Sequence, residues 1–399
     1  MEREEEKMGE KNLDFNRIIN RKNTRSLKYD FAKERGIPEE NLPLWVADMD
    51  FQVSSYIQEA LQAAVAHGIF GYSDVKEHYF EPLRAWMEKH HGWQVQKEWL
   101  VKTPGVVFAL AAAIRAFTEP GDGIIIQQPV YYPFANVVKH NGRKLVISNL
   151  VLTENGYQMD YADFEQKLVK EEVKLFILCS PHNPVGRVWK RQELEKIGDI
   201  CLKHGVFVVS DEIHADFAFK HRHTVFTSIK EEYKANSMVC TSPSKSFNLA
   251  GLQISNIFLP DGRRKKEFCR QIYAAGYDEL GLPALVACEA AYRYGEEWLN
   301  GVCTYICANE AYVREFVKDR LPKVRFGEWE GTYLIWLDFR AFGLSDEELN
   351  RKIIHEAGLW LDGGSMFGKA GEGFQRINIA CPRKTLEEAM ERLAGVFGE

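Results

Sequence analysis

Val206-Phe207-Val208-Val209-Ser210-Asp211-Glu212-Ile213-His214 is a short apolar run that ends abruptly in polar and charged residues. Such a run predicts a buried strand with polar side chains at its carboxyl end. Helical patterns separate it from four runs of the same kind, at residues 123–126, 144–147, 175–178 and 256–259. Strands that are apolar on both faces and alternate with helices are typical of a mostly parallel sheet covered on both sides, so the sequence predicts an α/β fold. Ligands of such sheets bind at the carboxyl ends of the strands.

Two further polar segments occupy strand ends: Ser180-Pro181-His182-Asn183-Pro184-Val185-Gly186 and Thr241-Ser242-Pro243-Ser244-Lys245-Ser246-Phe247-Asn248. Hydroxyls just before Lys245 suit a cofactor whose phosphate lies beside a Schiff base. Asp211 is placed to keep a cofactor ring nitrogen protonated in a desolvated pocket, and Asn183 to hydrogen-bond the phenolic oxygen. Together the segments predict a pyridoxal 5'-phosphate site. Taken singly, Asp211 also fits a helix N-cap and Asn183 a turn.

The stretch Thr103-Pro104-Gly105-Val106-Val107 precedes a strong helical pattern over residues 108–117. Free backbone N–H groups at a helix start stabilise a phosphate, so Gly105, Val106 and Val107 are predicted to bind it, with Ser242 and Ser244 adding hydroxyl donors. A simple entry turn is the alternative. Tyr131 is placed to stack on the cofactor ring, although plain packing also accounts for an aromatic residue there.

The chain of 399 residues, 45% of them hydrophobic, is long enough for two lobes. We expect a large cofactor-binding domain over residues 50–285, and a small domain formed by residues 1–49 and 286–399. In the small domain the pattern predicts a long helical stretch from Pro283 to about Val317 and a strand over residues 332–338.

The net charge of −6 gives no electrostatic reason to expect nucleic acid or an anionic membrane as a partner. The apolar runs are too short to span a bilayer and the start lacks a signal-peptide core, so a cytoplasmic protein is expected. The eight cysteines lack the paired spacing of a zinc site, so we expect reduced thiols and no metal.

The segments around Asn183, Asp211 and Lys245 resemble those of the fold-type I pyridoxal-phosphate-dependent transferases, in the class I/II aminotransferase superfamily. Residues 43–51 (Pro-Leu-Trp-Val-Ala-Asp-Met-Asp-Phe), Lys22-Asn23-Thr24 and Ser244-Lys245-Ser246-Phe247-Asn248 resemble the MalY/PatB branch, whose members are carbon–sulfur lyases acting on cystathionine or cysteine. The resemblance implies a large domain with a mostly parallel seven-stranded sheet flanked by helices, and a smaller α/β C-terminal domain.

The resemblance also implies roles for single residues. Lys245 forms the Schiff base, Asp211 pairs with the pyridine nitrogen, Asn183 contacts the phenolic oxygen and Tyr131 stacks on the ring. Tyr72 reaches the phosphate of the other subunit's cofactor, which implies a homodimer with shared active sites.

Arg376 matches the arginine that binds the substrate carboxylate, with a surface ion pair as the alternative. Trp45 and Asp48 are the guesses for further substrate contacts. Two positions depart from the aminotransferase pattern: His214 stands near the phenolic oxygen where many aminotransferases have tyrosine, and Gln253 replaces a phosphate-binding arginine.

The predicted reaction is α,β-elimination, which releases a thiol, pyruvate and ammonia. Lys245 is the general base, and Lys245 or Tyr131 protonates the leaving sulfur. An aminotransferase that passes the amino group to a 2-oxo acid is the alternative enzyme. A regulator that uses the fold to bind a partner protein is a third possibility, against which an intact Lys245 and Asp211 argue.

Overall fold

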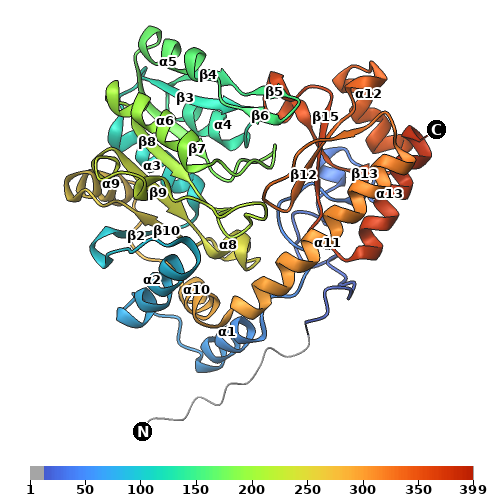
Figure 1. Ribbon diagram of the computed structural model, residues 1–399. Helices are drawn as coiled ribbons and strands as arrows, with labels where there is room; N and C mark the ends of the chain where they lie inside the picture. Colours follow the sequence, from blue (N-terminus) through green and yellow to red (C-terminus); the bar gives the residue numbers. More distant parts are fainter. Residues whose placement is uncertain (1–12, 399) are drawn as a thin grey trace.

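A seven-stranded sheet forms the centre of the computed structural model, which describes residues 13–398. The strand order is β2 (Leu100–Thr103), β10 (Ser255–Phe258), β9 (Ser237–Thr241), β8 (Phe207–Asp211), β7 (Val173–Cys179), β3 (Gly123–Gln128) and β4 (Lys144–Asn149). Only β10 runs antiparallel to its neighbours, β2 and β9; the other pairs are parallel. The predicted α/β fold with a mostly parallel seven-stranded sheet is confirmed (Figure 1).

Alternate side chains of the central strands pack on opposite faces of this sheet. Ile124 and Ile126 of β3 belong to one hydrophobic cluster, and Ile125 between them belongs to another. The first cluster contains residues of α3 (Val106–Phe117), α4 (Pro133–His140) and α9 (Gly262–Ala274). The second contains residues of α5 (Tyr161–Lys170), α6 (Arg191–Lys203) and α7 (Tyr233–Asn236). Burial on both faces explains why these strands are rich in consecutive apolar residues.

A second, antiparallel sheet has the order β11 (Arg325–Phe326), β12 (Leu334–Asp338), β15 (Phe374–Asn378) and β14 (Asp362–Gly363). Residues of α12 (Asp346–Arg351) and α13 (Arg383–Phe397) share a hydrophobic cluster with residues of β12 and β15. The N-terminal segment joins this part, because β1 (Leu42–Pro43) pairs in parallel with β13 (Leu359–Trp360). A small hairpin of β5 (Val151–Thr153) and β6 (Gly156–Gln158) completes the strands. The exact domain boundaries stay a prediction.

The prediction of one long helical stretch from Pro283 to about Val317 is wrong. The segment forms two helices, α10 (Leu282–Tyr294) and α11 (Glu296–Arg320). The helix is interrupted at Gly295, where a Cβ atom would lie 2.5 Å from the Ala291 carbonyl oxygen and 2.5 Å from a Phe247 ring carbon. Only glycine fits so close a passage. Helices α1 (Ser55–His67) and α2 (Glu77–His91) pack on α10.

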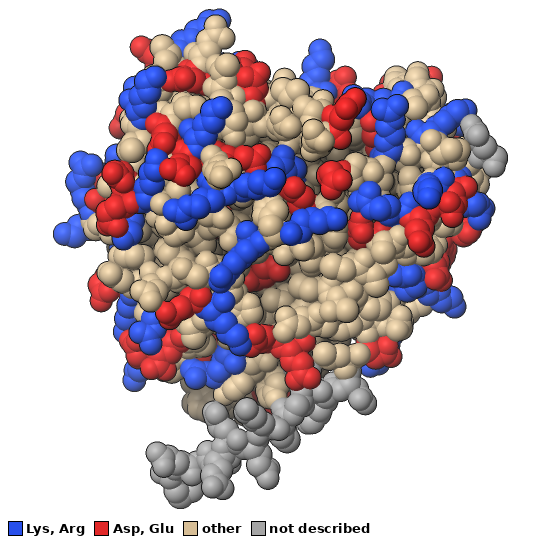
Figure 2. Space-filling view, viewed as in Figure 1, with Lys and Arg blue, Asp and Glu red and all other residues tan. Residues whose placement is uncertain are grey.

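Acidic and basic side chains are interspersed over the face shown in Figure 2, in keeping with the modest net charge. No helix within residues 13–398 is both long and apolar enough to cross a membrane.

Candidate cofactor and substrate site

A cavity of about 150 Å³ lies where β7 and β8 end and α3 begins. Because parallel strands bring their carboxyl ends to one edge of the sheet, side chains far apart in the sequence meet there. The cavity wall contains nine of the residues predicted from the sequence: Gly105, Val106, Val107, Tyr131, Asn183, Asp211, His214, Ser244 and Lys245.

Lys245 projects into this cavity from the one-turn helix α8 (Pro243–Ser246). Its Nζ donates to the Ala47 carbonyl oxygen at 2.6 Å. Burial lowers the pKa of Lys245 to about 8, with the Arg376 charge acting in the same direction and the Asp48 and Asp211 carboxylates opposing it. A lysine with such a pKa is partly neutral near physiological pH, as a nucleophile or general base must be.

Asp211 is the last residue of β8 and is 5% exposed. Within residues 13–398, its carboxylate accepts one hydrogen bond, from the Ile213 backbone N–H at 3.1 Å. Burial raises the pKa of Asp211 to about 7, against the opposing effects of that hydrogen bond and of Lys245. A protonated ring nitrogen is the cationic partner that this carboxylate lacks, so Asp211 fits the predicted role.

His214 is buried beside the same cavity, and its ring meets Tyr333 edge to face at 5.7 Å. Burial lowers the pKa of His214 well below its ordinary value, and the charges of Lys245 and Arg376 act in the same direction. Its Nδ1 has no hydrogen-bond partner within the described residues. A neutral imidazole with a spare nitrogen suits a polar contact to a bound ligand.

The start of α3, where the sequence predicts phosphate binding, has free backbone donors and open space. Gly105 has a φ of 106°, and no heavy atom lies within 4 Å of the position that a Cβ would take. The first intrahelical bond there is from the Ala109 N–H to the Gly105 carbonyl, which leaves the N–H groups of Val106 and Val107 without helical partners. Gln253, which replaces the family's arginine, also lines the cavity.

Ser242 differs from expectation, because it does not line the cavity. It is the N-cap of α8: its hydroxyl accepts from the Ser244 N–H at 3.0 Å and donates to the Ile254 carbonyl at 2.6 Å. Pro243 at the first helical position fixes the helix start and so makes Ser242 the cap. Of the two serines, only Ser244 lines the cavity.

Arg376 lies on β15 and is buried, so the alternative of a surface ion pair is ruled out. Its guanidinium donates to the Asn183 side-chain oxygen at 3.0 Å, to the Trp45 carbonyl at 2.7 Å and to the Asp362 carboxylate. The Nε–H has no partner within residues 13–398. A buried guanidinium held in place with a donor to spare is suited to a carboxylate ligand.

Arg376 is not among the residues that line the cofactor cavity, and the remaining predicted residues also lie outside it. The Trp45 ring stacks on Trp360 at 4.4 Å, so only the Trp45 backbone carbonyl reaches the site, through Arg376. The Asp48 carboxylate is held by Arg21. Tyr72 is 99% exposed, between α1 and α2.

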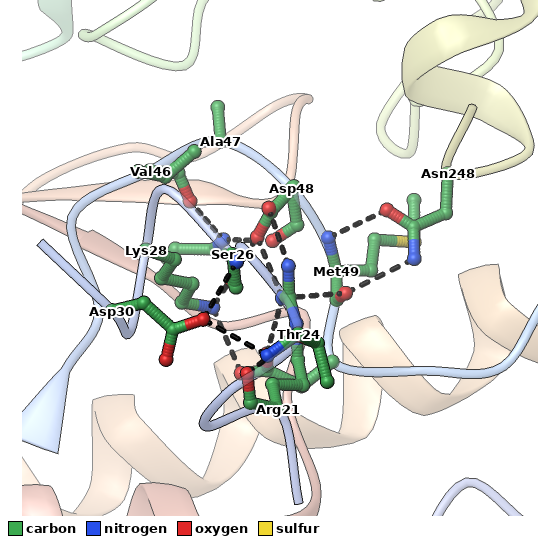
Figure 3. A network of polar contacts seen from close by, with 12 residues as sticks. Arg21, Thr24, Ser26, Lys28, Asp30, Val46, Ala47, Asp48, Met49 and Asn248 are labelled. Carbon is green, nitrogen blue, oxygen red and sulfur yellow. Dashed lines mark hydrogen bonds and ion pairs between the residues drawn. The ribbon is translucent and has the colours of Figure 1, made fainter. Parts of the chain in front are cut away.

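Residues 45–51, here called the strap, form the wall that carries the Ala47 carbonyl. Asn378 donates to the Val46 carbonyl at 2.7 Å and to the Asp48 carbonyl at 2.6 Å, and Tyr333 donates to the Ala47 carbonyl at 2.8 Å. Asn248 accepts from the Met49 N–H and donates to the Met49 carbonyl (Figure 3). The sequence signalled the strap only as a motif, with no role for these partners.

Two cations neutralise the acidic residues of the strap. Arg21 donates to Asp48 at 2.9 and 2.8 Å (Figure 3). Arg21 also donates to Asp50 at 2.7 Å, and the fully buried Lys28 donates to Asp50 at 2.8 Å. Burial alone would raise the pKa of Asp48, but the hydrogen bonds and charges of Arg21 and the charge of Lys28 hold it below its ordinary value. The strap also lines a second cavity, of about 630 Å³. This cavity adjoins the first, because Ala47, Lys245 and Ala250 line both.

Groups of three or more side chains able to hold a metal ion are not found within residues 13–398.

The fold, with a lysine and a carboxylate facing one cavity at the carboxyl edge of the sheet, is that of the fold-type I pyridoxal-phosphate-dependent transferases. The chain belongs to the aminotransferase class I and II family, whose model matches residues 42–393.

Three relatives place the chain more closely within this family. It is 42% identical to the cystathionine beta-lyase PatB of Bacillus subtilis, over 96% of this chain and 99% of that protein. It is 31% identical to the protein MalY of Escherichia coli, over 96% and 98% of the two chains. The crystal structure of cystalysin from Treponema denticola, which contains pyridoxal 5'-phosphate, superposes with a TM-score of 0.92 at 38% identity, covering 96% of this chain and 98% of that one.

Proposed function

We propose that this protein is a pyridoxal-phosphate-dependent carbon–sulfur β-lyase. Its substrates are L-cystathionine or related cysteine thioethers, which with water give a thiol, pyruvate and ammonia. The observation that carries the proposal is that Lys245 and Asp211 face one cavity and that burial has moved both pKa values toward neutrality, to about 8 and about 7. The names and similarity of PatB and MalY favour elimination over amino transfer.

Residues of the cavity and Arg376, which contacts the cavity residue Asn183, would share the binding of cofactor and substrate. Bound pyridoxal phosphate supplies the electron sink for the substrate Cα carbanion. Asp211 holds a proton on the ring nitrogen, the Val106 and Val107 N–H groups and Ser244 receive the phosphate, and Asn183 and His214 lie at the cavity wall to contact the ring substituents. Arg376 receives the substrate carboxylate through its unpaired Nε–H, while Asp362 and Asn183 keep the guanidinium in place.

Two cavity residues move protons. Lys245, neutral above a pKa of about 8, removes the Cα proton with Nζ. Burial raises the pKa of Tyr131 above its ordinary value, so its hydroxyl stays protonated and is suited to donate to the leaving sulfur. The Ala47 carbonyl orients Nζ in both roles of the lysine, first as the attachment point and then as the base.

The test is to mix the purified protein, loaded with pyridoxal phosphate, with L-cystathionine and to measure free thiol and pyruvate. We expect equal release of both, and a loss of at least about a thousandfold in kcat for Lys245→Ala, since a covalent anchor and a general base disappear together. Lys265→Ala, which alters a lysine of α9 outside the cavity, is the matched control.

The alternative, an aminotransferase, is checked in the same experiment by adding a 2-oxo acid. Transfer of the amino group without pyruvate release would replace the lyase proposal. A protein that fails to take up pyridoxal phosphate would instead favour the binding-protein alternative.

We further propose a cytoplasmic homodimer. Exposed apolar side chains cluster in and after α1, at Val65, Ile69, Phe70 and Tyr72, which are 62–99% exposed. An apolar patch of this kind is typical of a subunit interface, where Tyr72 would reach the partner's phosphate site. Sedimentation should give a dimer, and Tyr72→Ala should weaken phosphate binding. The eight cysteines, all free, suit a reducing compartment.

A further inference from the structure

A buried polar network lies directly behind the catalytic lysine and takes no part in the chemistry proposed above. Its centre is Asp216, whose carboxylate accepts from Trp86 Nε1 at 3.0 Å, from His91 Nε2 at 3.0 Å and from the Ser246 hydroxyl. The side chains of Asp216 and His91 are 9% and 5% exposed. Ser246 is the residue that follows Lys245 and ends α8.

Asp216 is ionised in this environment. Burial alone would raise its pKa, but the hydrogen bond and charge of His91 and the bonds from Ser246 and Trp86 lower the pKa to about 2. An ionised carboxylate can only accept hydrogen bonds, so His91 carries its proton on Nε2 and Ser246 directs its hydroxyl hydrogen to Asp216. The direction of each bond is thereby fixed.

A second buried pair, Glu212 and His223, stands beside the first. His223 Nε2 lies 2.7 Å from the Glu212 carboxylate, and both side chains are 1% exposed. The rings of His91 and His223 meet edge to face at 5.8 Å. Because Glu212 follows Asp211 and Ser246 follows Lys245, the two pairs adjoin the two residues that the cofactor needs most.

Energetics argue against a purely stabilising role. Buried ion pairs gain little over apolar residues of similar size, because desolvation offsets their attraction, whereas well-defined hydrogen bonds fix geometry. The helix α8 is a single turn of four residues and is too short to hold its own shape. Its last side chain is tied through Asp216 to two residues of the much longer α2, Trp86 and His91.

We propose that Asp216 and His91 are positioning residues that act through Ser246 to hold Lys245 Nζ at the Ala47 carbonyl. Without the Ser246 hydroxyl the helical turn loses its hydrogen-bonded link to α2 and keeps only the packing of Phe247 on Trp86. Nζ then departs from the place from which it must attack the cofactor and remove the substrate proton. A misplaced Nζ lowers the rates of both steps. The Arg376 site is separate, so substrate affinity stays intact.

The experiment compares Ser246→Ala, Ser246→Thr and the control Ser228→Ala, an exposed serine that donates only to a backbone carbonyl. Two readouts are needed: the rate at which cofactor-free protein attaches added pyridoxal phosphate, followed by absorbance, and kcat and KM for L-cystathionine. Asp216→Asn and His91→Gln are measured alongside.

For Ser246→Ala we expect both the attachment rate and kcat to fall about tenfold with little change in KM or melting temperature. Ser246→Thr, which keeps the hydroxyl, should restore both rates to within about twofold of the wild-type rates. Unchanged rates in Ser246→Ala would overturn the proposal, and so would losses that threonine does not restore and that follow a falling melting temperature. The attachment rate does not depend on the reaction catalysed, so this test stands even if the lyase activity fails.

Discussion

The cofactor cavity and the strap share Ala47, yet their charged groups are in opposite conditions. In the cavity, Asp211 accepts one backbone hydrogen bond and Lys245 donates to one carbonyl, so burial dominates and moves both pKa values toward neutrality. In the strap, Asp48 and Asp50 each face Arg21 and Lys28, and pairing outweighs burial for Asp48. Burial without a partner leaves a group ready to react, whereas burial with a partner makes a rigid support.

The largest effect is expected from breaking the strap. Lys28→Met leaves Asp50 with one cation in place of two in a buried setting, and should lower the free energy of unfolding by about 3–5 kcal/mol. Urea unfolding measures it. The exposed neighbour Lys22→Met is the control, with an expected change within about 0.5 kcal/mol. Equal losses in the two variants would show that the strap is not held by its ion pairs.

The buried Asp211 carboxylate of the cavity should make the stability of the protein depend on pH. The folded pKa of Asp211 is about 7 and its ordinary value is 3.8, so between these values the folded state holds a proton that the unfolded state has lost. In cofactor-free protein, this group should therefore reduce stability as pH rises from about 4 to about 7, by up to about 1.4 kcal/mol per pH unit. Unfolding measured over this range in wild type and Asp211→Asn isolates the contribution. If the free energy of unfolding changed with pH equally in the two proteins, burial would not raise the pKa of Asp211.

Arg376 combines both conditions, since it is paired with Asp362 and keeps one free donor. Arg376→Lys retains the charge but not the planar fork, and should lower kcat/KM for L-cystathionine by about 10–100-fold, corresponding to about 1.5–3 kcal/mol. Steady-state kinetics with Arg314→Lys, on the exposed face of α11, provides the comparison. An unaltered kcat/KM would remove Arg376 from the substrate site.

The strands missed from the sequence show where pattern reasoning ends. The five apolar runs became β3, β4, β7, β8 and β10, but no run was assigned to β2 or β9 of the same sheet. β2 (Leu100–Thr103) carries Lys102 and lies at the edge of the sheet, where only one neighbour pairs with it. β9 (Ser237–Thr241) begins and ends in hydroxyl residues, which weakens its apolar pattern. β2 is held by pairing with β10, and β9 by pairing with both β10 and β8.

The local sequence was enough to predict that Lys245, Asp211 and Asn183 belong to one site, because polar residues at strand ends and a lysine after hydroxyl residues rarely occur together in that order. The three residues line one cavity. The tertiary structure alone showed that Ser242 is a helix cap, that the Trp45 ring turns toward Trp360, and that Arg21 and Lys28 neutralise the strap. The Ser242 outcome depends on a helix start, the ion pairs join side chains 22 to 29 positions apart, and the Trp45 and Trp360 rings meet across more than three hundred positions. Burial, which sets the pKa values of the site, exists only once those segments have packed together.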